Sequence, residues 1–427
     1  MGIGVLIVGS GAREHALTWK ALQSPLTSSV FCAPGNAATA AIAINTGLSA
    51  TDVDGILRFV AERDIGLTII GPEAAVAAGL ADRLAQAQRL VFGPTQAAGR
   101  IESSKAFAKS LMERSGVRTP RYRVFDDPAT AKDYVRGEQR AFVVKADGLA
   151  KGKGTLVPHD ADETLEAIDT LMLQRTVGAA ADRIVLEEKL EGREVSLMAL
   201  VDGEHIVPLP PVCDYKRALD RDKGPNTGGM GGYSPIPWFG PAEVQRAVET
   251  ALAPIVAALR EDGTPYRGCL YAGLMVGPDG VQVLEFNARF GDPEAQVVLP
   301  RLEGDLIALL EAAAAGDLTS RSASSSERAS VGVVLASRGY PGTYPTGFPI
   351  DGLGTIERDV FVFHAGSAAS ASGYLTAGGR VLTVVALGDS LGDARERAYR
   401  NVDRIHFDGM SFRHDLALRE VETAALR

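Results

Sequence analysis

The sequence predicts a multidomain α/β protein that begins with a parallel sheet, continues through a smaller α/β segment and ends in an α+β domain. Its 427 residues exceed what a single hydrophobic core usually holds. Short apolar strand patterns alternate with helical patterns at the start of the chain, which is typical of a parallel sheet covered on both faces. A polar, serine-rich stretch at 319–329 then precedes the last predicted strands. We expect domains at 1–103, 104–320 and 331–427, with a linker at 321–330.

The first domain is predicted to place three glycine-containing turns at one edge of its sheet. The patterns run in the order strand 5–8, helix 12–22, strand 30–32, helix 53–63, strand 67–70, helix 74–87 and strand 90–92. The carboxyl ends of parallel strands meet at one edge, where α/β sheets bind ligands. The turns at that edge are Gly9-Ser10-Gly11, Ala33-Pro34-Gly35-Asn36 and Gly71-Pro72-Glu73. We expect these turns to face a ligand.

The second domain contains a segment, at about 122–190, that we expect to form a lid. A helix at 105–113 comes before this segment. Residues 121–125 lead into it, and strand patterns follow at 142–145, 155–157, 183–187 and 195–200. In the third domain, strands are predicted at 331–335, 360–364 and 381–386, with a helix at 393–402.

The composition excludes several classes of protein. The net charge of −9 argues against a nucleic-acid-binding surface, which needs a basic face. Cys32, Cys213 and Cys269 are far apart and lack CxxC spacing, which fits a reducing cytoplasm and gives no support for a zinc site. No apolar stretch approaches the ~20 residues of a membrane helix, and no heptad repeat is evident. We expect a cytoplasmic monomer without nucleic-acid or membrane partners.

The most informative feature is a glycine-dense run from Asp222 to Pro235 that has almost no core-forming side chains. Glycine costs backbone entropy and is used where main chain approaches a ligand or adopts positive φ. Further along, Glu285, Asn287 and Arg289 alternate in a predicted strand and therefore share one face. A carboxylate, an amide oxygen and a guanidinium there can hold a metal, its phosphate oxygens and an anionic substrate. Together the two runs predict an enzyme that spends ATP.

Two neighbouring groups extend this candidate site. Asp214, Lys216 and Arg217, just before the glycine-dense run, are candidate substrate contacts by proximity. Lys145 ends an apolar strand, and Lys151 and Lys153 follow in a glycine-containing loop that can close over polyphosphate. The loop lacks the GxxxxGK[ST] pattern of a Walker loop. A solvated basic hairpin would explain Lys151 and Lys153 but not Lys145, which is costly to bury without an anionic partner.

Two weaker patterns leave alternatives open. The turn at Gly9 opens a helix and is a natural anion site, but Glu14 stands where a dinucleotide-binding turn has its third glycine. The same glycines would also serve tight packing of the helix on the strand. Glu187, Leu190 and Glu194 lie at and beyond the end of another apolar strand, where they can meet an adenine edge and ribose or remain solvated.

In this order the motifs resemble those of the phosphoribosylamine–glycine ligase (glycinamide ribonucleotide synthetase) family, a member of the ATP-grasp superfamily. The resemblance covers essentially the full length. The runs that carry it are 9–16, 33–36, 71–73, 92–95, 145–150, 224–231, 285–287, 289–294, 339–342 and 363–366. It implies an ATP-grasp domain at 104–320 behind an N-terminal pre-ATP-grasp domain.

The resemblance also implies the reaction and the residues that serve it. ATP, glycine and 5-phosphoribosylamine would give ADP, phosphate and glycinamide ribonucleotide through glycyl phosphate, in de novo purine synthesis. The implied ATP contacts are Lys105, Lys145, Lys151, Lys153, Glu187, Leu190 and Glu194. The implied substrate contacts are Gly9, Ser10, Gly11, Asn36, Glu73, Asp214, Lys216, Asn226 and Arg289. Glu285 and Asn287 would bind Mg²⁺ or Mn²⁺, and Arg289 and Lys145 would act by positioning and charge neutralisation.

Three departures from the family pattern bear on substrate affinity. The segment 177–181 reads Val-Gly-Ala-Ala-Ala, Arg221 stands where a small residue is common, and Leu274 occupies a position where a second acidic metal ligand would fit. An ATP-grasp ligase or carboxylase for another carboxylate would keep the ATP half of the site. A non-catalytic nucleotide-binding protein would lack Lys145, Glu285 or Asn287, and all three are present.

Overall fold

The N-terminal region forms a five-stranded parallel sheet in a computed structural model that describes residues 2–150 and 152–426. The strand order is β3-β2-β1-β4-β5. The strands are β1 (Ile3–Gly9), β2 (Thr27–Pro34), β3 (Ile44–Asn45), β4 (Ile65–Ile70) and β5 (Val91–Phe92). The helices are α1 (Ala12–Ala21), α2 (Thr39–Ile42), α3 (Val53–Glu62), α4 (Glu73–Ala77) and α5 (Leu80–Gln86). The helix predicted at 74–87 is divided because Gly79 takes a φ of 75°.

A four-stranded antiparallel sheet with its own helices occupies the predicted lid segment. The order is β6-β9-β7-β8. The strands are β6 (Tyr122–Phe125), β7 (Val143–Ala146), β8 (Thr155–Leu156) and β9 (Ile184–Glu187). The helices are α8 (Pro128–Glu138), α9 (Ala161–Ile168), a π-helical turn (Asp169–Leu173) and a 3₁₀ turn (Gly178–Ala181). Their buried side chains form a core that draws on residues 131–186.

A second antiparallel sheet, in the order β11-β10-β16-β17, runs through the middle of the molecule. Its strands are β10 (Arg193–Asp202), β11 (Ile206–Pro208), β16 (Arg267–Gly277) and β17 (Gly280–Asn287). The helices of this region are α6 (Arg100–Ser103), α7 (Lys105–Arg114), α10 (Pro241–Ala247), a π-helical turn (Val248–Leu252), α11 (Ala253–Glu261), α12 (Glu294–Val298) and α13 (Leu306–Ala315). A short pair of strands, β18 (Leu302–Glu303) and β19 (Ser324–Ser325), takes in part of the serine-rich stretch.

The C-terminal region builds a sheet in the order β12-β15-β20-β25-β22, with β26 beside β20. Its strands are β12 (Cys213–Asp214), β15 (Gly231–Ser234), β20 (Ala329–Ser337), β22 (Val360–His364), β25 (Arg380–Gly388) and β26 (Met410–Ser411). The smaller elements are the hairpin β13 (Arg217–Leu219)–β14 (Lys223–Asn226), the sheet β21 (Pro349–Ile350), β24 (Gly373–Thr376) and β23 (Ser367–Ser370), and the 3₁₀ turns Asp220–Asp222 and Leu353–Thr355. The helices are α14 (Leu391–Val402) and α15 (Leu418–Ala425).

The glycine-dense run is part of this C-terminal sheet. β15 pairs antiparallel with β20, and Gly231 lies opposite Val333. A Cβ on Gly231 would meet the Gly332 carbonyl oxygen at 2.3 Å, so glycine is required there for the strands to approach. Strands from both sides of the serine-rich stretch therefore share one sheet, which sequence analysis did not anticipate.

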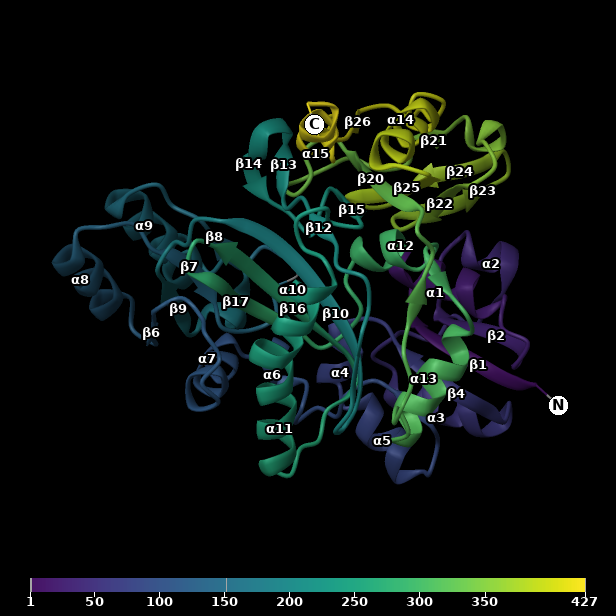
Figure 1. The fold of residues 1–427 in the computed structure, drawn as a ribbon, viewed down its shortest axis with the longest axis horizontal. Coiled ribbons are helices and arrows are strands. Elements are labelled where there is room, and N and C mark those ends of the chain that lie inside the picture. The colour runs from purple at the N-terminus through teal and green to yellow at the C-terminus, as the bar shows by residue number, and fades with distance from the viewer. Residues whose placement is uncertain (1, 151, 427) are drawn as a thin grey trace.

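The lid elements stand at one side of the molecule, while the N-terminal and C-terminal regions both flank the central sheet (Figure 1). One hydrophobic cluster includes Val5 of β1, Leu200 of β10 and Phe363 of β22. None of the helices in the described part of the chain is long and apolar enough to cross a membrane.

Candidate active site

A cavity of about 1150 Å³ lies where the lid, the central sheet and the N- and C-terminal regions meet. Most residues predicted to form the site line it. They are Gly9, Ser10, Gly11, Glu73, Lys105, Lys145, Glu187, Leu190, Glu194, Asp214, Lys216, Asn226, Glu285, Asn287 and Arg289. The chain positions joined there span most of the sequence, so the cavity is a product of tertiary folding.

Glu285 and Asn287 lie two residues apart at the end of β17 and both line the cavity. Burial alone would raise the pKa of Glu285, but Lys216, Lys105, Lys145 and Arg289 lower it to about 2. The carboxylate is therefore ionised at neutral pH. Its nearest ion-pair contact is loose, with Lys216 Nζ 4.0 Å from Oε1. The predicted metal-binding pair thus presents oxygens to the cavity with little competition from the protein.

Three buried charged groups, Lys109, Lys145 and Glu187, form ion pairs where the lid sheet meets α7; we call this contact the lid joint. Lys145, 5% exposed, lies 2.9 Å from Glu187 and donates a hydrogen bond to the Leu284 carbonyl oxygen at 3.1 Å. Lys109, from α7, lies 3.1 Å from the other oxygen of Glu187. Burial lowers the pKa of Lys109 to about 8, although Glu187 opposes this shift. Lys145, the predicted phosphate-binding lysine, is thus held in place by Glu187, which also pairs with Lys109.

Lys109 was not predicted as a site residue, because a lysine on a helix is usually solvated. The available signal was its spacing of four from Lys105, which places both amines on one face of α7.

Arg289 is fixed by two carboxylates at the opposite wall. Its guanidinium lies 3.0 Å from Glu73 and 3.1 Å from Glu102. Burial alone would lower the pKa of Arg289, and Glu102 and Glu73 raise it instead. Glu102 also accepts a hydrogen bond from the Ala288 backbone N–H at 2.7 Å. Glu73 was predicted, whereas Glu102 was missed because nothing in a short helical turn marks it as buried.

The remaining wall combines Asp214, Lys216 and Glu194. Lys216 Nζ lies 3.2 Å from a carboxylate oxygen of Glu194. A predicted substrate contact, Lys216, therefore lies next to a predicted ATP contact, Glu194. Burial, followed by repulsion from Glu294, raises the pKa of Asp214 well above its usual range. One oxygen of Asp214 is buried and accepts no hydrogen bond from the described residues. Asp214 therefore lines the cavity with one acceptor oxygen that has no hydrogen-bond donor among the described residues.

Arg380 ties the glycine-dense run to this wall. It donates to the Gly228 carbonyl oxygen at 2.8 Å and the Asp292 carbonyl oxygen at 2.7 Å. It arises from β25, far from both in sequence, and could not be assigned from the sequence.

Two predicted residues of the described part of the chain, Asn36 and Lys153, are not among those that line the cavity. The Asn36 amide nitrogen donates to Ser10 O at 3.0 Å and to His364 O at 2.8 Å, and its oxygen accepts from two backbone N–H groups. Its hydrogen-bonding capacity is used within the protein, so Asn36 shapes the turn beside the cavity. Lys153 is exposed on the loop whose Gly152 and Gly154 line the cavity. Lys151 lies outside the described residues.

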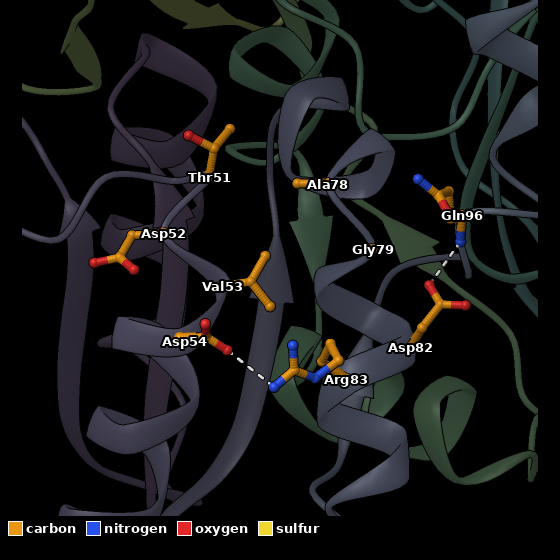
Figure 2. Close-up of a pocket in the computed structure, with 9 residues that line it drawn as sticks. All are labelled: Thr51, Asp52, Val53, Asp54, Ala78, Gly79, Asp82, Arg83 and Gln96. Carbon is orange, nitrogen blue, oxygen red and sulfur yellow. Dashed lines mark hydrogen bonds and ion pairs between the residues drawn. The ribbon is translucent and has the colours of Figure 1, made fainter.

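A second cavity, of about 450 Å³, lies between the starts of α3 and α5 (Figure 2). Figure 2 shows its two internal contacts, the Asp54–Arg83 ion pair and the hydrogen bond that Asp82 accepts from the Gln96 backbone N–H. No residue of the predicted site lines it. Of its charged groups, Asp54 and Arg83 pair with each other, and Asp52 and Asp82 accept hydrogen bonds from backbone N–H groups.

The lid sheet and the central antiparallel sheet enclose lysines, an ionised carboxylate and an amide. This arrangement defines an ATP-grasp enzyme. Models of the phosphoribosylglycinamide synthetase family match nearly the whole chain. The N domain matches residues 3–102, the ATP-grasp (A) domain 103–295 and the C domain 330–419. The chain belongs to the phosphoribosylamine–glycine ligase family.

Individual relatives agree with this assignment. A phosphoribosylamine–glycine ligase of Halalkalibacterium halodurans is 43% identical over 424 residues, which is 99% of each chain. The crystal structure of the phosphoribosylamine–glycine ligase of Thermotoga maritima is similar with a TM-score of 0.85 and 33% identity, over 97% of this chain and 100% of that one. The biotin carboxylase domain of Hydrogenobacter thermophilus 2-oxoglutarate carboxylase, crystallised with MgADP, has a TM-score of 0.73 over 96% of this chain and 92% of that one. Its 16% identity shows a shared fold alone.

Proposed function

We propose that the protein joins glycine to 5-phosphoribosylamine and uses ATP to do so, in the second step of de novo purine synthesis. The products are glycinamide ribonucleotide, ADP and phosphate. The observation that carries this proposal is the cavity in which the strand residues Glu285 and Asn287 lie with Arg289, Lys105 and Lys145. This arrangement suits the transfer of a phosphoryl group to a carboxylate, because the chemistry needs positioning and charge neutralisation.

The reaction we propose has two steps. A glycine carboxylate oxygen attacks the γ-phosphorus of ATP, the bond to the bridging oxygen breaks, and ADP leaves with that electron pair. The amine of phosphoribosylamine then attacks the carbonyl carbon of glycyl phosphate, phosphate leaves, and the nitrogen loses a proton to solvent. No covalent enzyme intermediate is formed. The protein therefore contributes cations and shape rather than a nucleophile.

For the ATP end we propose the lid residues and their neighbours. Lys105, Lys145, Lys151 and Lys153 would neutralise the phosphates. Leu190 and Glu194 would contact adenosine, and Glu187 would act chiefly as the counter-ion of Lys145. The 2.9 Å pair between Lys145 and Glu187 supports this division of roles, since a carboxylate shared by two lysines is not free to bind a base.

Glu285 and Asn287 fit a magnesium or manganese ion that travels with ATP. The part of the chain described by the structure contains no cluster of three or more His, Cys, Asp or Glu side chains suited to a metal. Nucleotide-bound Mg²⁺ takes one or two protein oxygens and leaves the rest to phosphate and water, so a pair is sufficient. The ion would offset the negative charge of the phosphates. The ionised state of Glu285 supports the assignment.

For the other substrates we propose the wall opposite the lid. Gly9, Ser10, Gly11, Glu73, Asp214, Lys216 and Asn226 would contact glycine or phosphoribosylamine, with Asn36 holding the first turn in shape. Arg289 would face the acyl phosphate. Ion pairs with Glu73 and Glu102 hold its guanidinium in place before substrate binds.

We also propose a cytoplasmic monomer with the domain limits given by the sequence. The free thiols of Cys32, Cys213 and Cys269 support a reducing compartment. The isolated core of the lid supports its treatment as a subdomain at about 122–190.

The proposal is tested by ADP release from purified protein with ATP and Mg²⁺, when glycine and phosphoribosylamine, generated in situ, are omitted in turn. Release that needs both supports the ligase and its acceptor. Release that ignores glycine but responds to another carboxylate contradicts the substrate assignment and leaves the ATP site standing. A matched reaction with Glu285→Ala protein measures contaminating ATPase.

A further inference from the structure

The hairpin β13–β14 carries the glycine-dense run to the cavity, and its tip has an unusual backbone. Arg221 and Asp222 have φ values of 58° and 51°, in the left-handed region that non-glycine residues rarely adopt. The 3₁₀ turn that contains them has no buried residue. A solvent-exposed tip of this kind needs contacts from elsewhere to keep its shape.

Those contacts come from the segment that follows β26. The Arg413 side chain is fully buried, and its guanidinium donates to Asp222 Oδ1 at 2.8 Å and to the Arg217 carbonyl oxygen at 3.2 Å. It also forms a two-point ion pair with Asp415, at 2.8 and 2.7 Å. Asp415 in turn accepts the Arg221 backbone N–H at 2.8 Å. One guanidinium thus joins strand β13 and the tip of the hairpin to the C-terminal region.

A second pair of contacts supports the same joint. Asp220 accepts hydrogen bonds from the His414 backbone N–H at 2.8 Å and shares one with its ring at 3.1 Å. We call this set, Arg413, His414 and Asp415 with Arg217, Asp220, Arg221 and Asp222, the hairpin latch.

The hairpin latch also reaches the strand that bears the substrate-side residues. Arg413 stacks on Tyr215, 4.6 Å from the ring centroid, and Tyr215 lies between Asp214 and Lys216. The Tyr215 backbone N–H donates to Gly231 O at 3.0 Å and its carbonyl accepts from Met230 at 2.8 Å. Movement of Arg413 would therefore displace both ends of the glycine-dense run.

We infer that Arg413 is a positioning residue for the ligase reaction, which holds the hairpin β13–β14 so that Lys216 and Asn226 face the glycine side of the cavity. This inference rests on the proposed function. Arg413 itself is not among the residues that line the cavity, so its effect passes through the hairpin. A guanidinium suits the role because its planar fork serves two carboxylates and a carbonyl together, which an ammonium group cannot do.

The test uses Asp222, because its side chain is 71% exposed and its removal does not open a core. Asp222→Ala breaks the contact with Arg413, and Asp222→Glu restores a carboxylate within reach. Asp408→Ala is the matched control, since Asp408 is 67% exposed and pairs with the exposed Arg338 in the same region of the chain. Arg413→Lys provides a second break of the hairpin latch that keeps the charge.

Two readouts are compared. Without substrates, trypsin cleavage in 217–223 should quicken about tenfold in Asp222→Ala and in Arg413→Lys, and return towards the native rate in Asp222→Glu. With substrates, kcat/KM for glycine should fall about tenfold in the same variants while KM for ATP changes less than about twofold.

Unchanged cleavage, or equal changes in the glycine and ATP parameters, would overturn the inference. So would an effect of Asp408→Ala as large as that of Asp222→Ala. Cleavage is measured without turnover, so a failure of the proposed reaction leaves that readout intact and the two failures are distinguishable.

Discussion

The lid and the rest of the molecule differ in how their cores are built. The lid core draws on residues 131–186 and on no other region. A second cluster combines Val283 of β17, Leu252 of the central helices and Val384 of β25. A third cluster combines β1, β10 and β22. A movement of the lid would therefore open none of these cores, whereas the other regions share cores with one another.

The joint between these two bodies is electrostatic. Lys109 belongs to α7 outside the lid, while Glu187 and Lys145 belong to the lid sheet. Lys145 reaches back to Leu284 O of β17. The residues proposed to hold the metal lie on the shared-core side, and those proposed to hold the phosphates and adenine lie on the lid or at its edge. The comparison predicts that changes on the shared-core side affect chemistry most, and changes at the joint affect ATP binding.

The largest effect is expected from Glu285→Ala. Loss of a direct metal ligand should cost more than loss of the groups behind it, so kcat should fall by at least about a hundredfold. The fold should remain, because the Glu285 side chain makes no close ion pair with the protein. Steady-state kinetics at saturating Mg²⁺ and the thermal unfolding midpoint measure the two quantities. Gln282→Ala on the same strand is the control, and an unchanged rate in Glu285→Ala would remove Glu285 as a ligand.

Breaking the joint should have the next largest effect. Lys109→Met keeps the length of the side chain but leaves Glu187 and Lys145 as a neutral pair. The site then loses one positive charge, and KM for ATP should rise about tenfold. Arg114→Met, at the exposed end of the same helix, is the control.

The titration of Lys109 should make ATP affinity depend on pH. Burial lowers the pKa of Lys109 to about 8 in the folded protein, from the ordinary lysine value of 10.5. Holding the charged amine in the folded state therefore costs stability at pH values below 8, and this cost disappears as pH rises towards 10.5. ATP affinity in the native enzyme should fall as pH rises through about 8, and Lys109→Met should lack that limb. An identical pH profile in both proteins would contradict a charged role for Lys109.

The mobility of the lid gives a smaller effect. ATP should slow trypsin cleavage within 129–189 several-fold, because closure protects exposed sites such as Arg136 and Arg175. Cleavage at Arg260, in α11 outside the lid, should not change and serves as an internal reference. Equal cleavage of the lid with and without ATP would show that the isolated core does not move as a unit on binding.

The smallest effect concerns stability on the shared-core side. The pKa of Asp214 is raised in the folded state, so its ionised form costs stability at neutral pH, and the cost disappears as pH falls below the unfolded value of about 4. Asp214→Asn should raise the free energy of unfolding by about 1 kcal/mol at pH 7 while activity falls. Denaturant melts at pH 7 and pH 4 measure the difference. A stabilisation that is equal at both pH values would mean that charge is not the cause.

Elements that depend on neighbouring residues in the chain could be predicted from the sequence, whereas features that depend on contacts between distant segments could not. Predicted strands such as 360–364 and 67–70 lie at or within observed strands, because burial on both faces makes the whole segment apolar. The helix at 74–87 was wrong as a single element, since Gly79 divides it. The strand pattern at 285–289 brought Glu285 and Asn287 to one cavity, because side chains on alternate positions share a face.

The sequence by itself determined the parallel N-terminal sheet, the lid sheet and the class of chemistry, since these depend on local periodicity and on motifs that stay together in the chain. Only the tertiary structure decided that β15 joins the C-terminal sheet, that Glu187 is shared by Lys109 and Lys145, and that Arg413 is buried against the hairpin. The physical reason is that burial and charge pairing between distant segments leave no pattern in either segment alone. From the sequence alone a lysine or arginine is predicted to be exposed to solvent. Only the folded structure shows which carboxylate pairs with it and allows it to be buried.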